Sequence, residues 1–265
     1  MPSKKVFIWN EYPKWRRVAR RILKEHLDDK VISRLREIPP EYVVSDDLSW
    51  LDDAVAEVKG FRPDTKAQLA SGLKQHYQYL RAYHGCRPVS LDSYRQLGVR
   101  PCNPSELQAI ARQIFKNKEG VEEAILHLAS SSRFLSYEEH NSGKVFFCLT
   151  RRELVEFCGH YLLHGSEYLQ AIACRINESH VLRERGKATV IECDIPIGDM
   201  DTRTISELAG VMLERIGYGL LRWPPETISS NFGLSITVPL AAKNIVAVEH
   251  PTGIPNPHNY NIRED

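Results

Sequence analysis

The chain has 265 residues, 42% of them hydrophobic and 26% charged, and its formal net charge is +1. This balance is typical of a globular protein and gives no whole-chain argument for a nucleic-acid or membrane partner. No segment approaches the roughly 18 consecutive apolar residues of a membrane span, and the basic start "KKVFIWNEYPKWRR" lacks the apolar core of a signal peptide.

Residues 1–60 are predicted to form a helical module with a basic part followed by an acidic part. The stretch "PKWRRVARRILKEHL" is predicted to be a helix that begins near Pro13. Its apolar residues share one helical face: Trp15, Val18, Ile22 and Leu23. Two interpretations of the basic stretch 14–24 stay open. Its charges either form the solvated face of an amphipathic helix or contact the phosphates of a nucleic acid or another charged partner.

Residues 61–250 alternate between predicted helices and strands. Helices are predicted at 64–80, 90–97, 104–116, 119–129, 151–176 and 204–216. Strands are predicted at 81–84, 144–149, 188–197, 233–240 and 244–250. Gly159 and Gly165 are weak points of the long helix, and the Pro- and Asn-rich residues 251–265 are predicted to be an irregular tail. The alternation indicates an α+β fold.

The cysteines and histidines show no metal-binding pattern. The six cysteines form no CxxC pair, and most lie in apolar runs, which is the pattern of free thiols in a reducing compartment. We therefore expect a cytoplasmic protein. His160 and His164 lie one helical turn apart, with Cys158 close by, but "HYLLH" lacks the acid of an HExxH zinc motif, so we expect no metal. The chain also lacks a Walker loop, GxGxxG and GxSxG.

One short motif carries a likeness to a known family. His84-Gly85-Cys86-Arg87 follows an apolar and aromatic stretch that is predicted to be a strand. The motif resembles the His-Gly-x-Arg that opens the NAD pocket of the ADP-ribosyltransferase fold, in its poly(ADP-ribose) polymerase and diphtheria-toxin-like branch. The next segment, "SYRQLGVRP", resembles the helix and glycine–proline turn that follow the histidine strand in that family.

Three later segments resemble the family in the same order along the chain. Residues 143–148 resemble its Gly-Lys-x-hydrophobic-Tyr-Phe-Ala strand, "IECDIPI" resembles its "EVDVPL" strand, and "TVPLAAKNIV" resembles its last strand and hairpin. The likeness spans residues 80–250, and the order of the motifs carries it more than any one motif. It implies a split β-sheet core with flanking helices, preceded here by a helical N-terminal extension.

The resemblance implies an enzyme that uses NAD as a substrate, releases nicotinamide and transfers ADP-ribose to a protein or nucleic-acid acceptor. His84 and Gly85 would anchor NAD, because an imidazole can bond a ribose hydroxyl and a glycine lets the carboxamide approach the backbone. Arg87 would hold the pyrophosphate or lock the loop. The aromatic residues that would line the nicotinamide slot are Phe146 and Phe157 or Tyr161.

Each of these assignments has a purely structural alternative. His84 can be a satisfied core or loop histidine, Phe146 can be a core residue, and Tyr161 can serve helix packing. The sequence also departs from the family in one aromatic position, since Phe146 stands where the family usually has a tyrosine. The ring can still stack on a ligand, but its hydroxyl contact is lost.

The second departure concerns the catalytic glutamate, which in the family opens the penultimate strand. No acid stands near 233–235, and the nearest candidate is Glu226. Glu226 can equally be a helix-start or loop carboxylate, and Glu249 and Glu167 are less well placed. The leading hypothesis is therefore an ADP-ribosyltransferase-like enzyme with His84 and Glu226 in catalysis. The alternatives are an inactive, divergent member that serves as a ligand-binding or interaction module, and an unrelated α+β protein.

Overall fold

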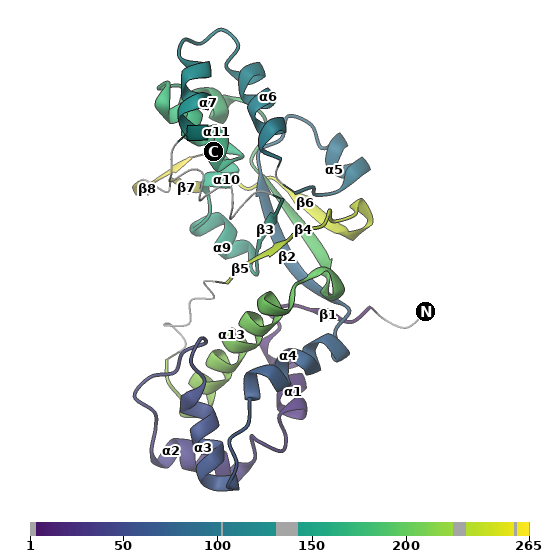
Figure 1. The fold of residues 1–265 in the computed structure, drawn as a ribbon, viewed down its shortest axis with the longest axis vertical. Coiled ribbons are helices and arrows are strands. Elements are labelled where there is room, and N and C mark those ends of the chain that lie inside the picture. The colour runs from purple at the N-terminus through teal and green to yellow at the C-terminus, as the bar shows by residue number, and fades with distance from the viewer. Residues whose placement is uncertain (1–3, 102, 131–142, 225–231, 257–258, 265) are drawn as a thin grey trace. The chain divides into compact units, whose positions relative to one another are not determined.

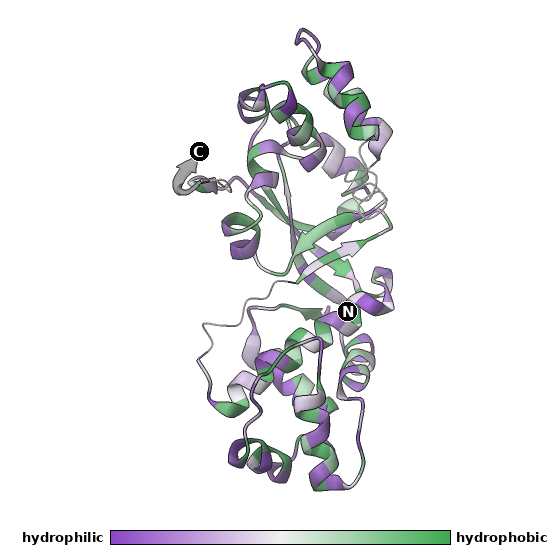
Figure 2. Cartoon of the chain, turned by 60° about the vertical axis from the view of Figure 1, so that its left-hand side comes forward, coloured by the Kyte–Doolittle hydropathy of each residue, from purple (hydrophilic) through white to green (hydrophobic). Residues whose placement is uncertain are grey.

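The computed structural model describes residues 4–101, 103–130, 143–224, 232–256 and 259–264 (Figure 1). These residues form helices and a six-stranded sheet, so the expected α+β class is confirmed. Hydrophobic residues follow the strands of the sheet, and the helices alternate between hydrophobic and hydrophilic residues (Figure 2). Within the described ranges, no helix has both the length and the hydrophobicity that a membrane crossing requires.

The chain folds into two compact units, and neither is a continuous stretch of sequence. Unit 1 comprises Met1–Arg81 and Pro196–Gly233, and unit 2 comprises Ala82–Ile195 and Leu234–Asp265. The division therefore does not follow the expected boundary at residue 60. The reason is that two helices of the expected second domain, at Thr65–His76 and Thr202–Leu221, pack with the N-terminal helices.

Unit 1 is mainly helical. Its elements are β1 (Val6–Phe7), α1 (Tyr12–Ile22), α2 (Asp29–Glu37), α3 (Ser49–Lys59), α4 (Thr65–His76), the short 3-10 helix η1 (Ile197–Asp199) and α13 (Thr202–Leu221). Helix α13 packs on α4 and α2, and α1 packs on α4. Trp15 of α1 is 1% exposed, with the Trp9 ring stacked on it at 5.4 Å. The predicted basic helix is thus present, and its apolar face is anchored in an aromatic core.

The strands belong mainly to unit 2. They are β2 (Tyr79–Cys86), β3 (Val145–Cys148), β4 (Thr189–Pro196), β5 (Gly233–Ile236) and β6 (Ile245–Glu249). The strand order is β5-β3-β2-β4-β6, with β1 paired in parallel to the first residues of β2. Strands β2 and β3 are antiparallel, with Tyr83 opposite Cys148, and β4 and β6 are also antiparallel. Four of the ranges predicted to be strands each contain one of these observed strands: 144–149, 188–197, 233–240 and 244–250.

The helices of unit 2 form two separate clusters. They are α5 (Asp92–Leu97), α6 (Pro104–Ile114), α7 (Val121–Ser130), α9 (Arg151–Glu156), α10 (His160–His164), α11 (Glu167–Arg175) and α12 (Ser179–Glu184). Helices α6, α7 and α11 surround one apolar core with Phe115 and Ile172 at its centre. Helices α9 and α10 share a second core with β4, in which Leu162 and Val190 are buried.

The long helix predicted at 151–176 is wrong, because the structure has three shorter helices there. Helix α9 ends at Glu156 and α10 begins at His160, so Gly159 lies at the first break. Gly165 ends α10 with φ +82°, a backbone conformation that residues other than glycine rarely adopt. The two glycines are therefore chain breaks, and they let α9 and α10 turn across the sheet.

The C-terminal segment is more ordered than the sequence indicates. Strands β7 (Ile254–Asn256) and β8 (Asn259–Glu264) form a two-stranded antiparallel sheet where an irregular tail was predicted. Ile254 is fully buried in the core of α9 and α10. Its side chain lies so close to Gly159 that a Cβ there would be 2.9 Å from Ile254 Cγ2. Residue 254 thus ties the tail to unit 2.

Candidate functional site

Strands β5, β3 and β2 lie next to one another in the sheet of unit 2. They contain the three segments that the motif resemblance requires to converge, at 233–236, 145–148 and 79–86. Residues 99 and 240 add a further link, since each donates its N–H to the carbonyl of the other at 2.9 Å. Gly98 has φ +77°, and a Cβ there would strike the Leu240 carbonyl, so the turn after the histidine strand requires glycine. Three of the motif segments are therefore neighbours in one sheet.

His84 is half-buried at the end of β2, and its ring has a fixed orientation. Its Nδ1 lies 2.9 Å from the carbonyl oxygen of Phe146. Because a carbonyl only accepts, Nδ1 carries the proton and donates it, and Nε2 of the neutral ring is an acceptor. Burial lowers the pKa of His84, although the bond to Phe146 partly offsets this effect. The site thus holds a neutral imidazole in one tautomer.

The β2–β3 register separates the site residues into two faces. Tyr83 lies opposite Cys148, so His84 lies opposite Phe147 and Gly85 lies opposite Phe146. The ring centroids of His84 and Phe147 are 5.6 Å apart, as this register requires. The Phe146 side chain therefore points to the other face of the sheet, the face on which Gly85 would carry a side chain.

Helices α9 and α10 approach the sheet closely at Gly85. A Cβ at this position would be 2.8 Å from Leu154 Cδ1 and 3.2 Å from Tyr161 Cβ. Since Leu154 is buried, any larger residue at 85 would push α9 and α10 away from β2. Helix packing is therefore a sufficient reason for this glycine. Tyr161 rests on the glycine as part of the same packing.

Two of the aromatic residues expected at the nicotinamide slot are exposed. Phe146 is 37% exposed and Phe157 is 62% exposed, whereas neighbouring Phe147 is 3% exposed. Phe146 comes from β3, and Phe157 caps the end of α9, which packs against that strand. Burying a phenylalanine side chain contributes roughly 1.5–3 kcal/mol, so each of these exposed rings is available to stack on a flat ligand.

Arg87 makes the contacts of a loop-locking residue. Its Nε donates to the Arg185 carbonyl at 3.2 Å, one terminal nitrogen donates to the Leu162 carbonyl at 3.1 Å, and the other donates to the Arg183 carbonyl. These carbonyls belong to α10 and to the end of α12, where helices leave carbonyls without partners. Of the two expected roles for this guanidinium, these bonds support the locking of the loop.

Of the three candidate carboxylates, the structure describes two. Glu226, the first choice, lies outside the described residues. Glu249 forms an ion pair with Arg151. Glu167, at the start of α11, accepts a 3.0 Å hydrogen bond from the Tyr161 hydroxyl, and its Oε1 lies 3.1 Å from His160 Nε2. A Cβ at Gly85 would lie 3.2 Å from Tyr161 Cβ, so Glu167 is linked to the end of β2 through Tyr161, although it is less well placed by sequence than Glu226.

The His160–Tyr161–Glu167 cluster is a functional candidate that sequence patterns did not reveal. The rings of His160 and Tyr161 are 4.1 Å apart, and both side chains meet one carboxylate. Glu167 follows Tyr161 by six residues and His160 by seven, and the helix breaks between them at Gly165. Helical periodicity therefore does not reveal the cluster. Among the described residues, no group of three His, Cys, Asp or Glu side chains is arranged to hold a metal ion.

Thiols surround this end of the sheet but differ in reactivity. Burial raises the pKa of Cys86 to about 12, so it stays protonated. Cys148 and Cys158 share a hydrogen bond, which lowers the pKa of Cys158 and raises that of Cys148. The His160 imidazole further lowers the pKa of Cys158, while burial opposes both effects. Cys158 is therefore the thiol of this group that most readily ionises.

Comparison with known proteins identifies no relative: no family model, no curated protein and no solved structure matches the chain. The grounds for assigning a function are therefore the motifs of the sequence and the arrangement of the residues that carry them.

Proposed function

We propose that the chain is an ADP-ribosyltransferase-like enzyme that binds NAD where the end of β2 lies beside the start of β3. The observation that carries the proposal is the neighbouring order β5-β3-β2, because it brings together segments that lie about 60 and 150 residues apart along the chain. Nothing in composition or periodicity requires those strands to be neighbours. The motif resemblance requires these three strands to be neighbours, and the strand order supports the proposal in this respect.

The proposed site uses both faces of the β2–β3 pair, because the side chains of His84 and Phe146 point to opposite faces. The exposed rings of Phe146 and Phe157 hold the nicotinamide by stacking. The resemblance assigns the carboxamide to the backbone at Gly85, against which Leu154 and Tyr161 also pack. His84 Nε2 accepts a hydrogen bond from a ribose hydroxyl, since Nδ1 donates to the Phe146 carbonyl. The same bond links the histidine to the strand that presents the stacking ring, so one displacement would disturb both contacts.

In the proposed reaction the bond between the nicotinamide nitrogen and ribose C1′ breaks, and nicotinamide leaves as a neutral base. A nucleophile of the acceptor then bonds C1′ and gives up its proton. A carboxylate near the ribose would stabilise the positive charge that develops on the ring. Glu167 is the described candidate for this role, and Glu226 remains the candidate from the sequence. The two make different predictions, since Glu167→Gln stops nicotinamide release only in the first case.

Thermal melting and nicotinamide release test the proposal together. NAD at 100 times its Kd stabilises a protein by about 2.7 kcal/mol, which appears as a higher melting temperature. Phe157→Ala is expected to abolish this shift without harming the fold, because the ring is 62% exposed. Leu126→Ala is the matched control, since Leu126 is 67% exposed on α7. No shift for the wild-type protein would overturn the proposal.

A second candidate function is a binding module without transferase activity. The observation that favours it is the absence of any acid from β5, whose residues are Gly-Leu-Ser-Ile. On this proposal NAD raises the melting temperature, His84→Ala abolishes the rise, and labelled NAD yields no nicotinamide even with cell lysate present. Release that depends on His84 would instead support the enzyme.

A further inference from the structure

Helix α1 of unit 1 carries an unusual density of positive charge. Its basic residues, with the lysine that follows the helix, are Lys14, Arg16, Arg17, Arg20, Arg21 and Lys24. All except Arg16 are exposed. The opposite face is buried, with Trp15 at 1% and Ala19 and Leu23 at 0% exposure. The helix is therefore fixed by its apolar side and presents a basic side to solvent.

Most of these charges have no acidic partner. Lys14 pairs with Glu11 at the start of the helix. Arg17 donates to the backbone carbonyl of Pro13. Neither Arg17 nor Arg21 lies within 4.0 Å of a carboxylate in the part of the chain that the structure describes. The same holds for Arg20 and Lys24 within those ranges.

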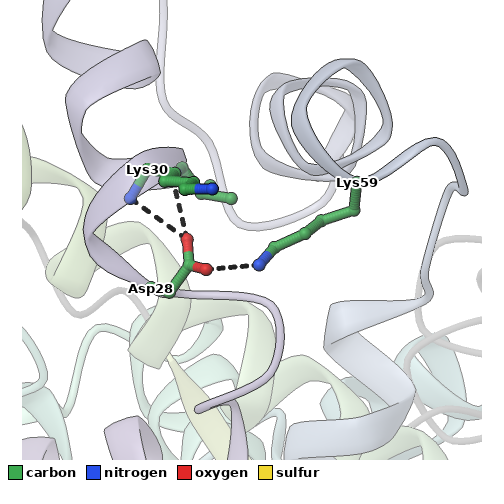
Figure 3. A network of polar contacts seen from close by, with 4 residues as sticks. Asp28, Lys30 and Lys59 are labelled. Atoms are coloured by element: carbon green, nitrogen blue, oxygen red, sulfur yellow. Dashed lines mark hydrogen bonds and ion pairs between the residues drawn. The ribbon is translucent and has the colours of Figure 1, made fainter.

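The basic residues of the neighbouring helices behave differently. Asp28 caps α2 and pairs with Lys59 at the end of α3, as Figure 3 shows. Arg34 pairs with Glu57, and Arg62 pairs with Asp53 at 3.2 Å. Within the described residues, unit 1 thus pairs Arg34, Lys59 and Arg62 with acids, whereas four of the six basic residues of α1 and its end have no acidic partner. Self-repulsion of such a face costs stability, so a partner that supplies negative charge is a physical reason for its presence.

The positive surface continues beyond α1. The pKa of His76, at the end of α4, is lowered first by burial and then by the positive charges of Lys5 and Arg21. These three side chains come from three separate segments of unit 1, yet they lie close enough to interact. No acidic group contributes to the shift. The field around α1 is therefore positive over more than one element.

We propose that the exposed face of α1, together with Lys5, binds the phosphate backbone of a nucleic acid. Each helical residue rises 1.5 Å, so Arg17 and Arg21 lie in a row about 6 Å long on α1, and Lys24 follows just after the helix ends. Such a row matches the closely spaced charges of a nucleic-acid strand. Guanidinium groups suit this contact, because their planar donors bond phosphate oxygens in pairs.

The composition of the face favours a nucleic acid over a membrane or a protein. A helix that lies on a membrane inserts its apolar side, but the apolar side of α1 is buried in the Trp15 core. Protein interfaces centre on exposed aromatic or aliphatic residues. None of the exposed large hydrophobic residues in the described ranges belongs to α1. The surface offers charge alone, so binding should be insensitive to base sequence and sensitive to salt.

Fluorescence anisotropy with the full-length chain and labelled 20-nucleotide single and double strands tests the proposal. The double variant Arg17→Ala/Arg21→Ala is expected to bind about tenfold more weakly at 100 mM salt, and the slope of log K against log salt should become shallower by about 2. The matched control is Arg62→Ala/Arg203→Ala. It removes the same charge from exposed arginines of unit 1 that already pair with Asp53 and Glu207.

Each result bears directly on the proposal. Loss in the α1 variant with less than a twofold change in the control supports it. Equal loss in both variants, or no binding by the wild-type chain, overturns it. Polyglutamate or vesicles of phosphatidylserine and phosphatidylcholine, bound as tightly as the oligonucleotides, would also overturn it in favour of an acidic protein or a membrane surface. None of these measurements involves NAD, so they stand apart from the proposed activity.

Discussion

Arg87 gives a direct test of how the site is held together, because the sequence allows it two roles. In the structure its guanidinium donates to the carbonyls of Leu162, Arg183 and Arg185. A hydrogen bond from a charged donor contributes about 1.5–3 kcal/mol, and we take about 1 kcal/mol for each of these half-buried bonds. Arg87→Ala should therefore lower the free energy of unfolding by about 3 kcal/mol.

Urea unfolding followed by circular dichroism measures this loss. Tryptophan fluorescence does not suit it, because all four tryptophans lie in unit 1 and Arg87 lies in unit 2. With a slope of about 2–3 kcal/mol per molar urea, the midpoint should fall by about 1 M. Arg87→Lys should recover little of this, since one ammonium cannot reach three carbonyls.

The control for this experiment is Arg95→Ala. Arg95 is an exposed arginine of the same unit, and it pairs with Asp92 at 3.7 Å. Such pairs contribute little, so we expect a change below about 0.5 kcal/mol. Arg87→Ala with a wild-type midpoint but no NAD-induced stabilisation would refute the reasoning and assign the guanidinium to the pyrophosphate.

Three further predictions concern other residues. Burial raises the pKa of Glu153 to about 7, so the folded chain loses stability as pH rises from about 4.5 to 7. Glu153→Gln, which can still cap its helix, should flatten this loss in thermal melts at pH 5 and pH 8, and an unchanged profile would argue against the burial. Cys158 should react with iodoacetamide at pH 7 faster than exposed Cys174, as mass spectrometry would show, because its pKa is lowered by a thiol hydrogen bond; slower labelling would contradict this. Gly217→Ala should destabilise unit 1 by about 2 kcal/mol in urea melts followed by tryptophan fluorescence, since a Cβ would lie 2.6 Å from Trp50 Cη2. A wild-type midpoint would mean that the ring has room to move.

The elements of the fold were largely accessible from the sequence, but their boundaries and grouping were not. Strands β3, β4 and β6 are short runs of β-branched, aromatic and apolar residues, and such runs have few alternatives. The helix predicted at 151–176 failed because apolar periodicity continues across Gly159 and Gly165. The grouping of α13 with the N-terminal helices depends on long-range packing, which no local pattern records.

The candidate site shows the same division. Short motifs placed His84, Gly85 and Arg87 correctly at the end of a strand. The partner of His84 is the backbone carbonyl of Phe146, and a carbonyl is present at every position and leaves no trace in the sequence. The contacts of Arg87 are carbonyls too. The hydrogen-bond partners of the polar side chains therefore could not be predicted from the sequence.

Because unit 1 is assembled from two stretches of chain, no single gene fragment encodes it. A truncated clone that starts at residue 82 would still encode α13 without the helices α4 and α2 that cover it. The side chains Ile205, Leu208, Met212 and Ile216 would then meet water, and insoluble product is the expected yield. A clone in which residue 195 is also joined to residue 234 through a short linker removes α13 as well, and is the route to expressing unit 2 by itself.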